Sequence, residues 1–389
     1  MKKKDFSIRN QKIVLVGHVT ESYGPMQALP DYLLKNCDLF GVISHPFSYC
    51  TIPCSKFYLY KKKKLKVEIS GPKYKFKSLF FIQYFSDVLL TFYFLIRAHG
   101  RWDIFIGCDC LNAFCGILLK KLKIVRKVVF YENEYKVRRF ESVILNSFFQ
   151  FFNGFTARRA DVVWDSPPGL ESLRESQSVM PERIIKVPHG VDLEKIKIPR
   201  RPFDRYKLVY VGHVTASKGL QLVTSALEEV VKTVPLVKMA IIGSGPFEPE
   251  LKKMVEEKKL TDNFIFWGFT DHDWTLDYLP KCAMGIAPYV SLDKQALMFA
   301  EPLKVKDYLA CGLPVIITSF AQLNTNIREN QMGAVVDYEK NQMVEAMLKL
   351  LTDDKFYYQC RKNVLSYKGK ISWKETFNQA FAKTLQITK

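Results

Sequence analysis

One stretch of this chain occurs twice. Residues 13–24 read IVLVGHVTESYG and residues 208–219 read LVYVGHVTASKG, so an apolar run leads each time into Gly-His-Val-Thr and a polar loop that ends in glycine. A buried strand followed by a short glycine-bearing loop is how a doubly wound α/β unit begins. Two such openings, half a chain apart, predict two facing Rossmann-like domains with parallel sheets. Ligands are expected in the interdomain cleft, at the carboxyl ends of the strands.

The length of 389 residues suits two domains of about 150–200 residues each. In chain order we expect a first Rossmann-like domain, a charged linker with prolines, a second Rossmann-like domain and a C-terminal helix: residues 1–192, 193–206, 207–370 and 371–389. The last helix carries Trp373, Phe377 and Phe381 on one stripe, and we expect it to pack back on the first domain.

Strand-like and helix-like segments alternate along both halves, which is typical of a parallel sheet with crossover helices. The predicted strands are residues 12–17, 39–43, 103–109, 127–133, 160–167, 183–192, 207–212, 237–242, 263–267, 283–287, 314–317 and 333–336. The predicted helices are residues 25–36, 78–96, 111–123, 140–160, 219–233, 247–258, 273–280, 302–310, 341–353 and 372–386, with a further helix beginning in GLESLRES.

The net charge of +19 is concentrated in the first half of the chain. Residues 1–200 carry 33 Lys and Arg against 18 Asp and Glu, whereas residues 201–389 carry 25 against 21. Such a field suits an anionic lipid surface, a nucleic acid or a phosphate-bearing substrate. The nearest match to a nucleic-acid-binding pattern is KYKFKSLFF at residues 73–81, and no known module surrounds it. We therefore expect no nucleic-acid partner.

The nine cysteines lack the spacing of a zinc site, so we expect buried free thiols and no metal ion. The N-terminal MKKKDFSIRNQ lacks the apolar core of a signal peptide, which favours a cytoplasmic protein. The most apolar stretch, residues 78–96, contains Gln83, Ser86 and Asp87, and a charge at that depth argues against a membrane span. It fits a core helix and a helix lying on a membrane equally well.

The second copy of the repeat has the features of a phosphate-binding loop. Lys218 stands directly before Gly219 and a predicted helix. Backbone amides at a helix N-terminus, with a lysine nearby, bind phosphate well, and His213 could add a donor. A solvated lysine ahead of an ordinary helix would give the same pattern. The first copy has Tyr23 at the position of Lys218, so only the second domain is predicted to bind phosphate in this way.

Two further segments of the second half carry candidate ligand-binding residues. Gly243 and Gly245 follow an apolar strand, where glycine permits either a tight turn or the close approach of a ligand. In PLKVKDYLACGLPVI, residues 302–316, a predicted helix places Lys304 and Asp307 within one turn. Lys304 could reach a phosphate, and Asp307 could accept two hydroxyls of a ribose. The alternative is an i, i+3 ion pair on an ordinary helix.

Two histidine-containing segments stand near the ends of predicted strands. His189, in His-Gly-Val-Asp before the linker, is expected at the mouth of the cleft. Asp271-His272-Asp273 has the form of a metal-binding Asp-x-Asp, but it stands between a strand and a helix, where Asp is a favoured N-cap. We interpret it as a helix cap.

In its second half the chain resembles glycosyltransferase family 4, the retaining GT-B enzymes. The matching motifs are VPHGVD (187–192), YVGHVTASKG (210–219), IIGSGP (241–246), FWGF (266–269) and PLKVKDYLACGLPVI (302–316). DIFIGCDCLNAFCG and RRADVVWDSP, both in the first half, are also similar to the family. The ordered set is specific, although each motif alone is weak.

The resemblance implies a nucleotide-sugar donor bound by the second domain. Lys218 would hold the donor diphosphate, and Asp307 stands where the family usually has the Glu that binds the ribose. His213 replaces the family's usual Arg, and the family's first acidic residue would fall on Phe299, for which Glu301 is a nearby substitute. The other implied donor-site residues are Gly212, Gly219, Gly243, Gly245, Leu303, Lys304 and, near the base, Gly268 and Phe269. The acceptor or cleft residues we place on the first domain are His18, Gly24, Glu134 and His189.

The resemblance therefore implies a hexosyltransferase that moves a sugar from a nucleotide-diphosphate donor to a lipid-linked or glycan acceptor in cell-surface polysaccharide or glycolipid synthesis, with retention and without a metal cofactor. The basic first domain favours a phosphate-linked polyprenol acceptor and an anionic membrane surface on the cytoplasmic side. The alternative is a nucleotide-sugar epimerase of the same fold, which would need acid and base residues around the sugar.

Overall fold

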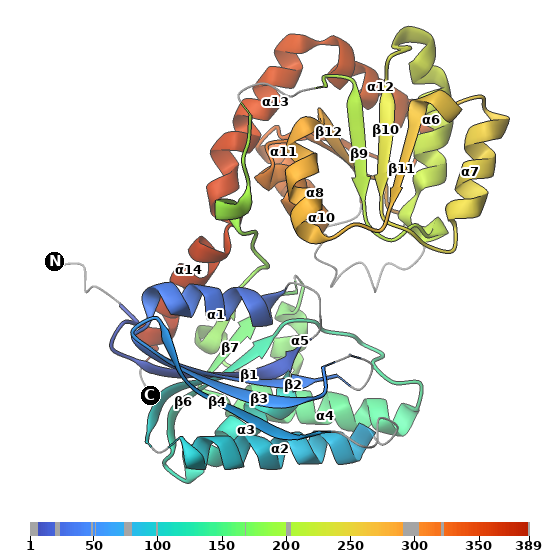
Figure 1. Cartoon of the computed structure of the whole chain (residues 1–389). Coiled ribbons are helices and arrows are strands. Elements are labelled where there is room, and N and C mark those ends of the chain that lie inside the picture. The colour runs from blue at the N-terminus through green and yellow to red at the C-terminus, as the bar shows by residue number, and fades with distance from the viewer. Residues whose placement is uncertain are drawn as a thin grey trace. The chain divides into compact units, whose positions relative to one another are not determined.

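The computed structural model of the chain describes residues 7–19, 24–47, 50, 52–73, 80–98, 100–167, 169–199, 204–290, 303–319 and 323–387. The chain forms two compact units, one of Met1–His189 with Trp373–Lys389 and one of Gly190–Ser372 (Figure 1). The predicted linker, residues 193–206, therefore falls within the second unit. There Leu193–Lys195 forms a short 3-10 helix, and Val191 makes a parallel bridge with Ser372.

The first unit is built on an eight-stranded sheet in the order β4-β3-β2-β1-β5-β6-β7-β8. Its strands are β1 Lys12–Val19, β2 Leu39–Pro46, β3 Cys54–Lys61, β4 Lys64–Lys73, β5 Trp102–Cys108, β6 Val125–Glu132, β7 Val162–Asp165 and β8 Ile184–Lys186. All neighbours pair in parallel except the β3–β4 hairpin and its pairing with β2, which are antiparallel. The hairpin adds an antiparallel edge to the predicted parallel sheet, because the basic run ends β3 at Lys61, turns at Lys62 and Lys63, and begins β4 at Lys64.

Helices cover both faces of this sheet: α1 Pro25–Asn36, α2 Phe80–Arg97, α3 Cys110–Lys121, α4 Val143–Arg159, α5 Glu171–Ser176 and α14 Trp373–Gln386. Alternate side chains of β1 separate two cores. Ile13 and Leu15 pack in the core that contains α1 and α14, whereas Val14 and Val16 pack in the core that contains α2 and α3. Helices α2, α3 and α4 lie together along one face of the sheet (Figure 1).

The last helix, α14, belongs to the first unit although it follows the second unit in sequence. The Phe381 ring packs edge-on against Trp164, with 5.0 Å between ring centroids, and it stacks on Tyr32 at 5.8 Å. The indole N–H of Trp164 donates a hydrogen bond to Thr384 Oγ1, with 2.9 Å between the heavy atoms. Trp373 and Phe377 belong to the same buried cluster.

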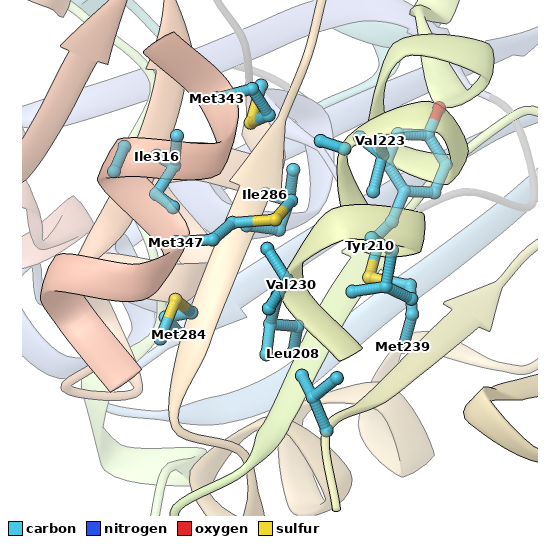
Figure 2. Close-up of a cluster of buried hydrophobic side chains, with 14 of the residues drawn as sticks. Leu208, Tyr210, Val223, Val230, Met239, Met284, Ile286, Ile316, Met343 and Met347 are labelled. Carbon is cyan, nitrogen blue, oxygen red and sulfur yellow. The ribbon is translucent and has the colours of Figure 1, made fainter. Parts of the chain in front are cut away.

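The second unit has a six-stranded, all-parallel sheet in the order β11-β10-β9-β12-β13-β14. Its strands are β9 Lys207–Val211, β10 Lys238–Ile242, β11 Phe264–Gly268, β12 Met284–Ala287, β13 Val315–Thr318 and β14 Gly333–Val336. The order reverses between β9 and β12, which is the arrangement of a Rossmann sheet. Figure 2 shows the buried cluster on one face of this sheet, where Leu208, Met284 and Ile286 meet side chains of the covering helices.

The helices of the second unit are α6 Leu220–Thr233, α7 Glu248–Glu257, α8 His272–Tyr278, α10 Leu303–Ala310, α11 Leu323–Glu329, α12 Lys340–Thr352 and α13 Asp354–Tyr367. The sequence analysis did not predict α11 or α13. Helix α13 buries only a narrow stripe that includes Tyr357, Cys360 and Val364, and many polar residues separate these positions.

Two findings bear on the expectations from composition. All nine cysteines are free and buried, as predicted. None of the described helices is both long enough and apolar enough to cross a membrane.

Replacing Phe381 by Ala should destabilise the first unit by about 3–5 kcal/mol, because it empties a site between Trp164 and Tyr32. Urea unfolding followed by tryptophan fluorescence measures this change. Lys374→Ala, on the exposed side of the same helix, is the matched control and should change the free energy of unfolding by less than about 0.5 kcal/mol. Equal effects of the two substitutions would show that α14 does not complete this core.

Candidate functional site at the carboxyl edge of the second sheet

Glycines line the carboxyl edge of the second sheet, so the backbone there carries no side chains. Gly212 follows β9, Gly243 follows β10, and Gly268 ends β11. Their φ angles of 132°, 128° and 68° lie in the region that favours glycine. The N–H of Gly212 donates to the carbonyl of Ile242 at 2.9 Å, and the N–H of Gly243 donates to Gly268 at 2.7 Å. Three neighbouring strands therefore end in a flat edge that a ligand can approach closely.

Backbone packing explains Gly243, Gly245 and Gly219. A Cβ atom would lie 2.1 Å from the Gly212 carbonyl oxygen at Gly243 and 2.2 Å from the Val214 oxygen at Gly245. At Gly219 it would lie 1.5 Å from the Pro288 oxygen. Of the two interpretations that the sequence left open for Gly243 and Gly245, the tight-turn interpretation accounts for both. These contacts fix the loops around the edge.

The loop of the second repeat leads into the N-terminus of a long helix. Ala216–Lys218 forms one 3-10 turn, and Gly219, with φ of 74°, precedes the first residue of α6. The first N–H groups of an α-helix have no partner within the helix. Together with the helix dipole they make this end of α6 suited to an anion, and Lys218 stands beside it.

Two lysines from distant segments lie near the same aromatic ring at this edge. Lys218 Nζ lies 5.3 Å from the ring centroid of Tyr289, which follows β12, and Lys304 Nζ of α10 lies 5.1 Å from the same centroid. Lys304 Nζ also lies 3.9 Å from the centroid of Tyr210. Strands β9 and β12 are the two neighbours between which the strand order reverses, so both lysines lie at the switch point where α/β sheets bind ligands.

The amine of Lys304 is buried without a hydrogen-bond partner among the described residues. Burial, and then the charge of Lys218, lowers the pKa of Lys304 well below its usual value. Within the described part of the chain, neither lysine forms an ion pair. A buried ammonium without an acceptor is unfavourable, and a phosphate between the two lysines would remove that cost.

The ordinary-helix alternative required an ion pair between Lys304 and Asp307. Asp307 does not make that pair. Its Oδ2 lies 3.6 Å from His272 Nε2 at the start of α8. Burial raises the pKa of Asp307, and the imidazole opposes that change. The hydrogen bond to Asp307 in turn raises the pKa of His272. Asp271 accepts a hydrogen bond from the Trp274 N–H at 2.7 Å, so the Asp271–Asp273 segment caps α8 as predicted.

The other predicted donor-site residues lie around the same edge or outside the described part. The His213 side chain is exposed, and its carbonyl accepts a hydrogen bond from the Tyr210 hydroxyl. Phe269 is 85% exposed directly after β11, and Leu303 begins α10. Glu301 lies outside the described residues. Within those residues, no cluster of three or more His, Cys, Asp or Glu is placed to hold a metal ion.

In the first unit, His18 lies in a buried network of charged groups. Its Nδ1 is 3.0 Å from Asp109 Oδ2, and its Nε2 is 3.2 Å from Asp87 Oδ2. Burial would lower the pKa of His18, but the two carboxylates raise it to about 9. Asp87 also contacts His45, whose pKa is lowered by burial. Asp109 follows β5, the neighbour of β1 at the switch point of the first sheet.

The structure does not bring the other predicted acceptor residues to His18 as direct contacts. Gly24 precedes α1, and its N–H donates to Gln27 Oε1 at 3.0 Å. Glu134 is exposed and pairs with Lys136 at 3.0 Å. The His189 ring lies against Trp373 at the end of the first unit. Five residues around His18 and around the edge of the second sheet were not predicted from the sequence: Asp87, Asp109, Tyr210, Tyr289 and His272. Among them, the strand-end position of Asp109 gave a signal in the sequence.

The second unit matches a known family of enzymes. Residues 205–353 match the family model described as glycosyl transferases group 1. The match confirms the resemblance of the sequence motifs to glycosyltransferases at the level of group 1.

Of three curated relatives, two are named as a mannosyltransferase and a glucosyltransferase, and one as a synthase. Alpha-monoglucosyldiacylglycerol synthase of Streptococcus pneumoniae is 26% identical over 179 residues, which are 42% of this chain and 39% of that protein. Chitobiosyldiphosphodolichol beta-mannosyltransferase of Candida glabrata is 23% identical over 61% of this chain and 51% of that protein. Poly(glycerol-phosphate) alpha-glucosyltransferase of Bacillus subtilis is 35% identical over 44% of this chain and 24% of that protein. The matched regions thus span between about a quarter and a half of the relatives' lengths.

Two solved structures cover nearly the whole chain. Sucrose-phosphate synthase of Thermosynechococcus elongatus gives a TM-score of 0.69 at 16% identity, over 97% of this chain and 100% of that one. HepE of Anabaena in complex with UDP gives a TM-score of 0.68 at 14% identity over the same shares. The predicted α/β fold of the GT-B glycosyltransferases is confirmed.

A diphosphate that binds here should take up a proton, because burial leaves the free Lys304 amine neutral over part of the alkaline range. Affinity for UDP or GDP should therefore rise as pH falls. Calorimetry in alkaline solution, in buffers of different ionisation enthalpy, should give a net uptake of protons on binding. Lys304→Met should abolish that uptake. Equal uptake in wild type and Lys304→Met would remove Lys304 from the anion site.

The His18 network predicts that the first unit loses stability in mildly alkaline solution. The folded pKa of His18, about 9, exceeds the unfolded value of 6.5. Its protonation therefore contributes fully below pH 6.5, and the contribution, on the order of 3 kcal/mol, is lost as pH rises through 9. Urea unfolding across this range should show the loss in wild type and in His213→Gln, which changes the exposed histidine of the second repeat. His18→Gln should lack it, and a pH dependence retained in His18→Gln would contradict the assignment.

Proposed function

We propose that this protein transfers a hexose from a nucleotide-diphosphate sugar to an acceptor in the synthesis of a glycolipid or polysaccharide. The observation that carries the proposal is the pair of lysines over Tyr289, because they lie at the switch point of a sheet in a group 1 glycosyltransferase domain. An amine buried at that place without a hydrogen-bond partner among the described residues is best explained by an anion that binds beside it.

The donor would bind along the glycine edge of the second sheet. Its diphosphate would lie between Lys218, Lys304 and the first N–H groups of α6. Asp307 would accept hydrogen bonds from the ribose hydroxyls, with His272 orienting its carboxylate. The base would lie near Gly268 and the exposed ring of Phe269, which offers a stacking surface.

The chemical contribution of this site would be electrostatic. As the bond from the sugar to the diphosphate oxygen breaks, negative charge grows on the leaving diphosphate. Lys218, Lys304 and the helix amides would stabilise that charge more strongly in the transition state than in the bound donor. Because these groups supply the positive charge, we propose that the reaction needs no metal cofactor. The acceptor hydroxyl would attack from the side of the leaving group and pass its proton to a donor phosphate oxygen, with retention of configuration.

The acceptor would bind the first unit, on the side of His18, Gly24, Glu134 and His189. The first half of the chain holds 33 Lys and Arg against 18 Asp and Glu, which suits a phosphate-linked lipid acceptor at an anionic membrane surface. Two of the relatives carry diacylglycerol and dolichol in their names, which supports a lipid-linked acceptor for this chain as well.

Thermal unfolding with UDP, GDP, ADP, CMP and their common sugar conjugates tests the donor site. We expect a rise in melting temperature with ligands of one base only, and loss of that rise in Lys218→Ala, because the diphosphate loses its ammonium partner. Turnover of Lys218→Ala should fall by about 100-fold or more. Lys355→Ala, an exposed lysine of α13, is the matched control and should behave as wild type.

Product analysis distinguishes transfer from other uses of a nucleotide sugar. Release of free nucleotide that requires an added acceptor indicates transfer. No shift with any nucleotide, or full activity of Lys218→Ala, would contradict the proposed donor site.

A further inference from the structure

Helix α2 buries several polar residues and exposes several large apolar ones, although Phe94 and Leu95 are buried in the core. Gln83, Asp87 and Thr91 are buried against the sheet, where Gln83 donates to the Pro46 carbonyl and Asp87 contacts His18. Four large side chains stand exposed on the opposite face, at spacings of four, four and three residues: Phe85, Leu89, Tyr93 and Ile96. This spacing forms one stripe along the helix, the reverse of an ordinary surface helix.

Helix α4 has the same reversed pattern. Asn153 and Thr156 are fully buried, and Asn153 donates to Glu132 at 2.6 Å. Ile144, Phe148 and Phe151 are 81%, 58% and 64% exposed. Their spacing of four and three residues again makes one outward stripe. The helix contains no acidic residue, and its sequence VILNSFFQFFNGFTARR ends in two arginines.

Helix α3 lies between these two helices and joins their outer surfaces. Phe114 of α3 packs edge-on against Phe152 of α4 at 4.8 Å, and Leu122, just after α3, is 60% exposed. An apolar cavity of about 110 Å³ opens among the three helices, lined by Tyr84, Cys110, Leu111, Phe140, Leu145, Phe148, Phe149 and Phe152. The outer surface of α2, α3 and α4, here called the α2–α4 face, is therefore apolar and hollowed.

Basic side chains border the α2–α4 face at the C-terminal ends of its helices. Each helix carries basic residues in its last turn and no acidic residue in its first: Arg97 in α2, Lys121 in α3 beside Lys120, which pairs with Asp161, and Arg158 and Arg159 in α4. Arg97 stacks over Tyr93 at 5.7 Å, and Arg159 over Phe155 at 5.2 Å. A second copy of the chain packed symmetrically on this face would bring like charges together. Anionic lipid head groups would instead complement the basic border.

We propose that the α2–α4 face docks on an anionic lipid bilayer, with the stripes of α2 and α4 inserted among the acyl chains and one chain end in the cavity. Only the purpose of this docking rests on the proposed function. That purpose is to hold the enzyme where a lipid-linked acceptor lies. Large apolar side chains would enter the bilayer while arginines at the helix ends reach the head groups. Tyr84 lines the cavity and also contacts the ring of His18 at 4.9 Å, so the cavity leads toward the polar network of the first unit.

Sedimentation of the full chain with vesicles tests the inference. We expect binding to vesicles of phosphatidylcholine with phosphatidylglycerol, weaker binding at high salt, and little binding to phosphatidylcholine alone. The double variant Phe148→Glu, Phe151→Glu should bind about tenfold more weakly or worse, because two inserted rings become charged. Leu236→Glu, which changes an equally exposed apolar residue of the second unit, should bind as wild type.

Fluorescence quenching locates the contact. A tryptophan introduced as Phe151→Trp should be quenched by vesicles with brominated acyl chains, whereas one introduced as Leu236→Trp should not. Failure of the wild type to bind anionic vesicles at low salt, or equal binding by the double glutamate variant, would overturn the inference. So would a wild-type dimer that the double variant breaks into monomers, since the face would then be an interface between copies.

The same variants separate this inference from the proposed function. The double glutamate variant should keep its melting temperature and its nucleotide-induced thermal shift, which shows that the fold and the donor site are intact. Lys218→Ala should lose the nucleotide shift and keep vesicle binding. If the wild type showed its nucleotide-induced thermal shift but did not bind vesicles, the docking face alone would be overturned.

Discussion

The main constraint on the proposed donor site is the amine of Lys304, which is buried at the carboxyl edge of the second sheet without a hydrogen-bond partner among the described residues. Lys304 reaches this edge from α10 and lies over the rings of Tyr210 and Tyr289, with Lys218 facing it across Tyr289. The ring faces offer only a weak attraction to a cation, which cannot replace the lost hydration. A Cβ at Gly212 would lie 3.0 Å from Lys304 Nζ, so the glycine of the repeat leaves room for the amine. The glycine edge, the N-terminus of α6 and the two lysines therefore suit one anion, which is the basis of the proposed donor site.

The two copies of Gly-His-Val-Thr show how one motif serves different chemistry. His18 of the first copy is buried between two carboxylates, which hold it protonated, whereas the side chain of His213 in the second copy is exposed. The difference comes from the neighbours, because β5 ends in Asp109 beside His18 while β12 leads to Tyr289 beside Lys218. The first unit thereby pairs its histidine with internal carboxylates, whereas in the second unit neither Lys218 nor Lys304 forms an ion pair among the described residues.

Much of this fold could be predicted from the sequence, because the parallel strands are short apolar runs between helices of ordinary length. The β3–β4 hairpin could not, since β4 is largely exposed and the turn uses Lys62 and Lys63 at positive φ rather than glycine or asparagine. The site divides in the same way. Lys218 and Lys304 stand in recognisable motifs, but Tyr289 is a lone aromatic residue whose place beside them depends on the order of strands. Asp87 meets His18 across 69 residues of sequence, which no local pattern records.

The apolar stretch at residues 78–96 was open to two interpretations, and α2 combines the features of both. Its polar residues were the argument against a membrane, yet they face the sheet, where Asp87 accepts hydrogen bonds from His18 and contacts His45. An 18-residue helix that turns its polar side inward leaves Phe85 and Leu89 on the outside. The buried network of the first unit thus dictates which face of α2 is exposed. The pairing of Asp87 with His18 at the end of β1 and the apolar outer surface both follow from this one orientation of the helix. A substitution that removed Asp87 would therefore disturb both, whereas a change at Phe85 would disturb the outer face alone.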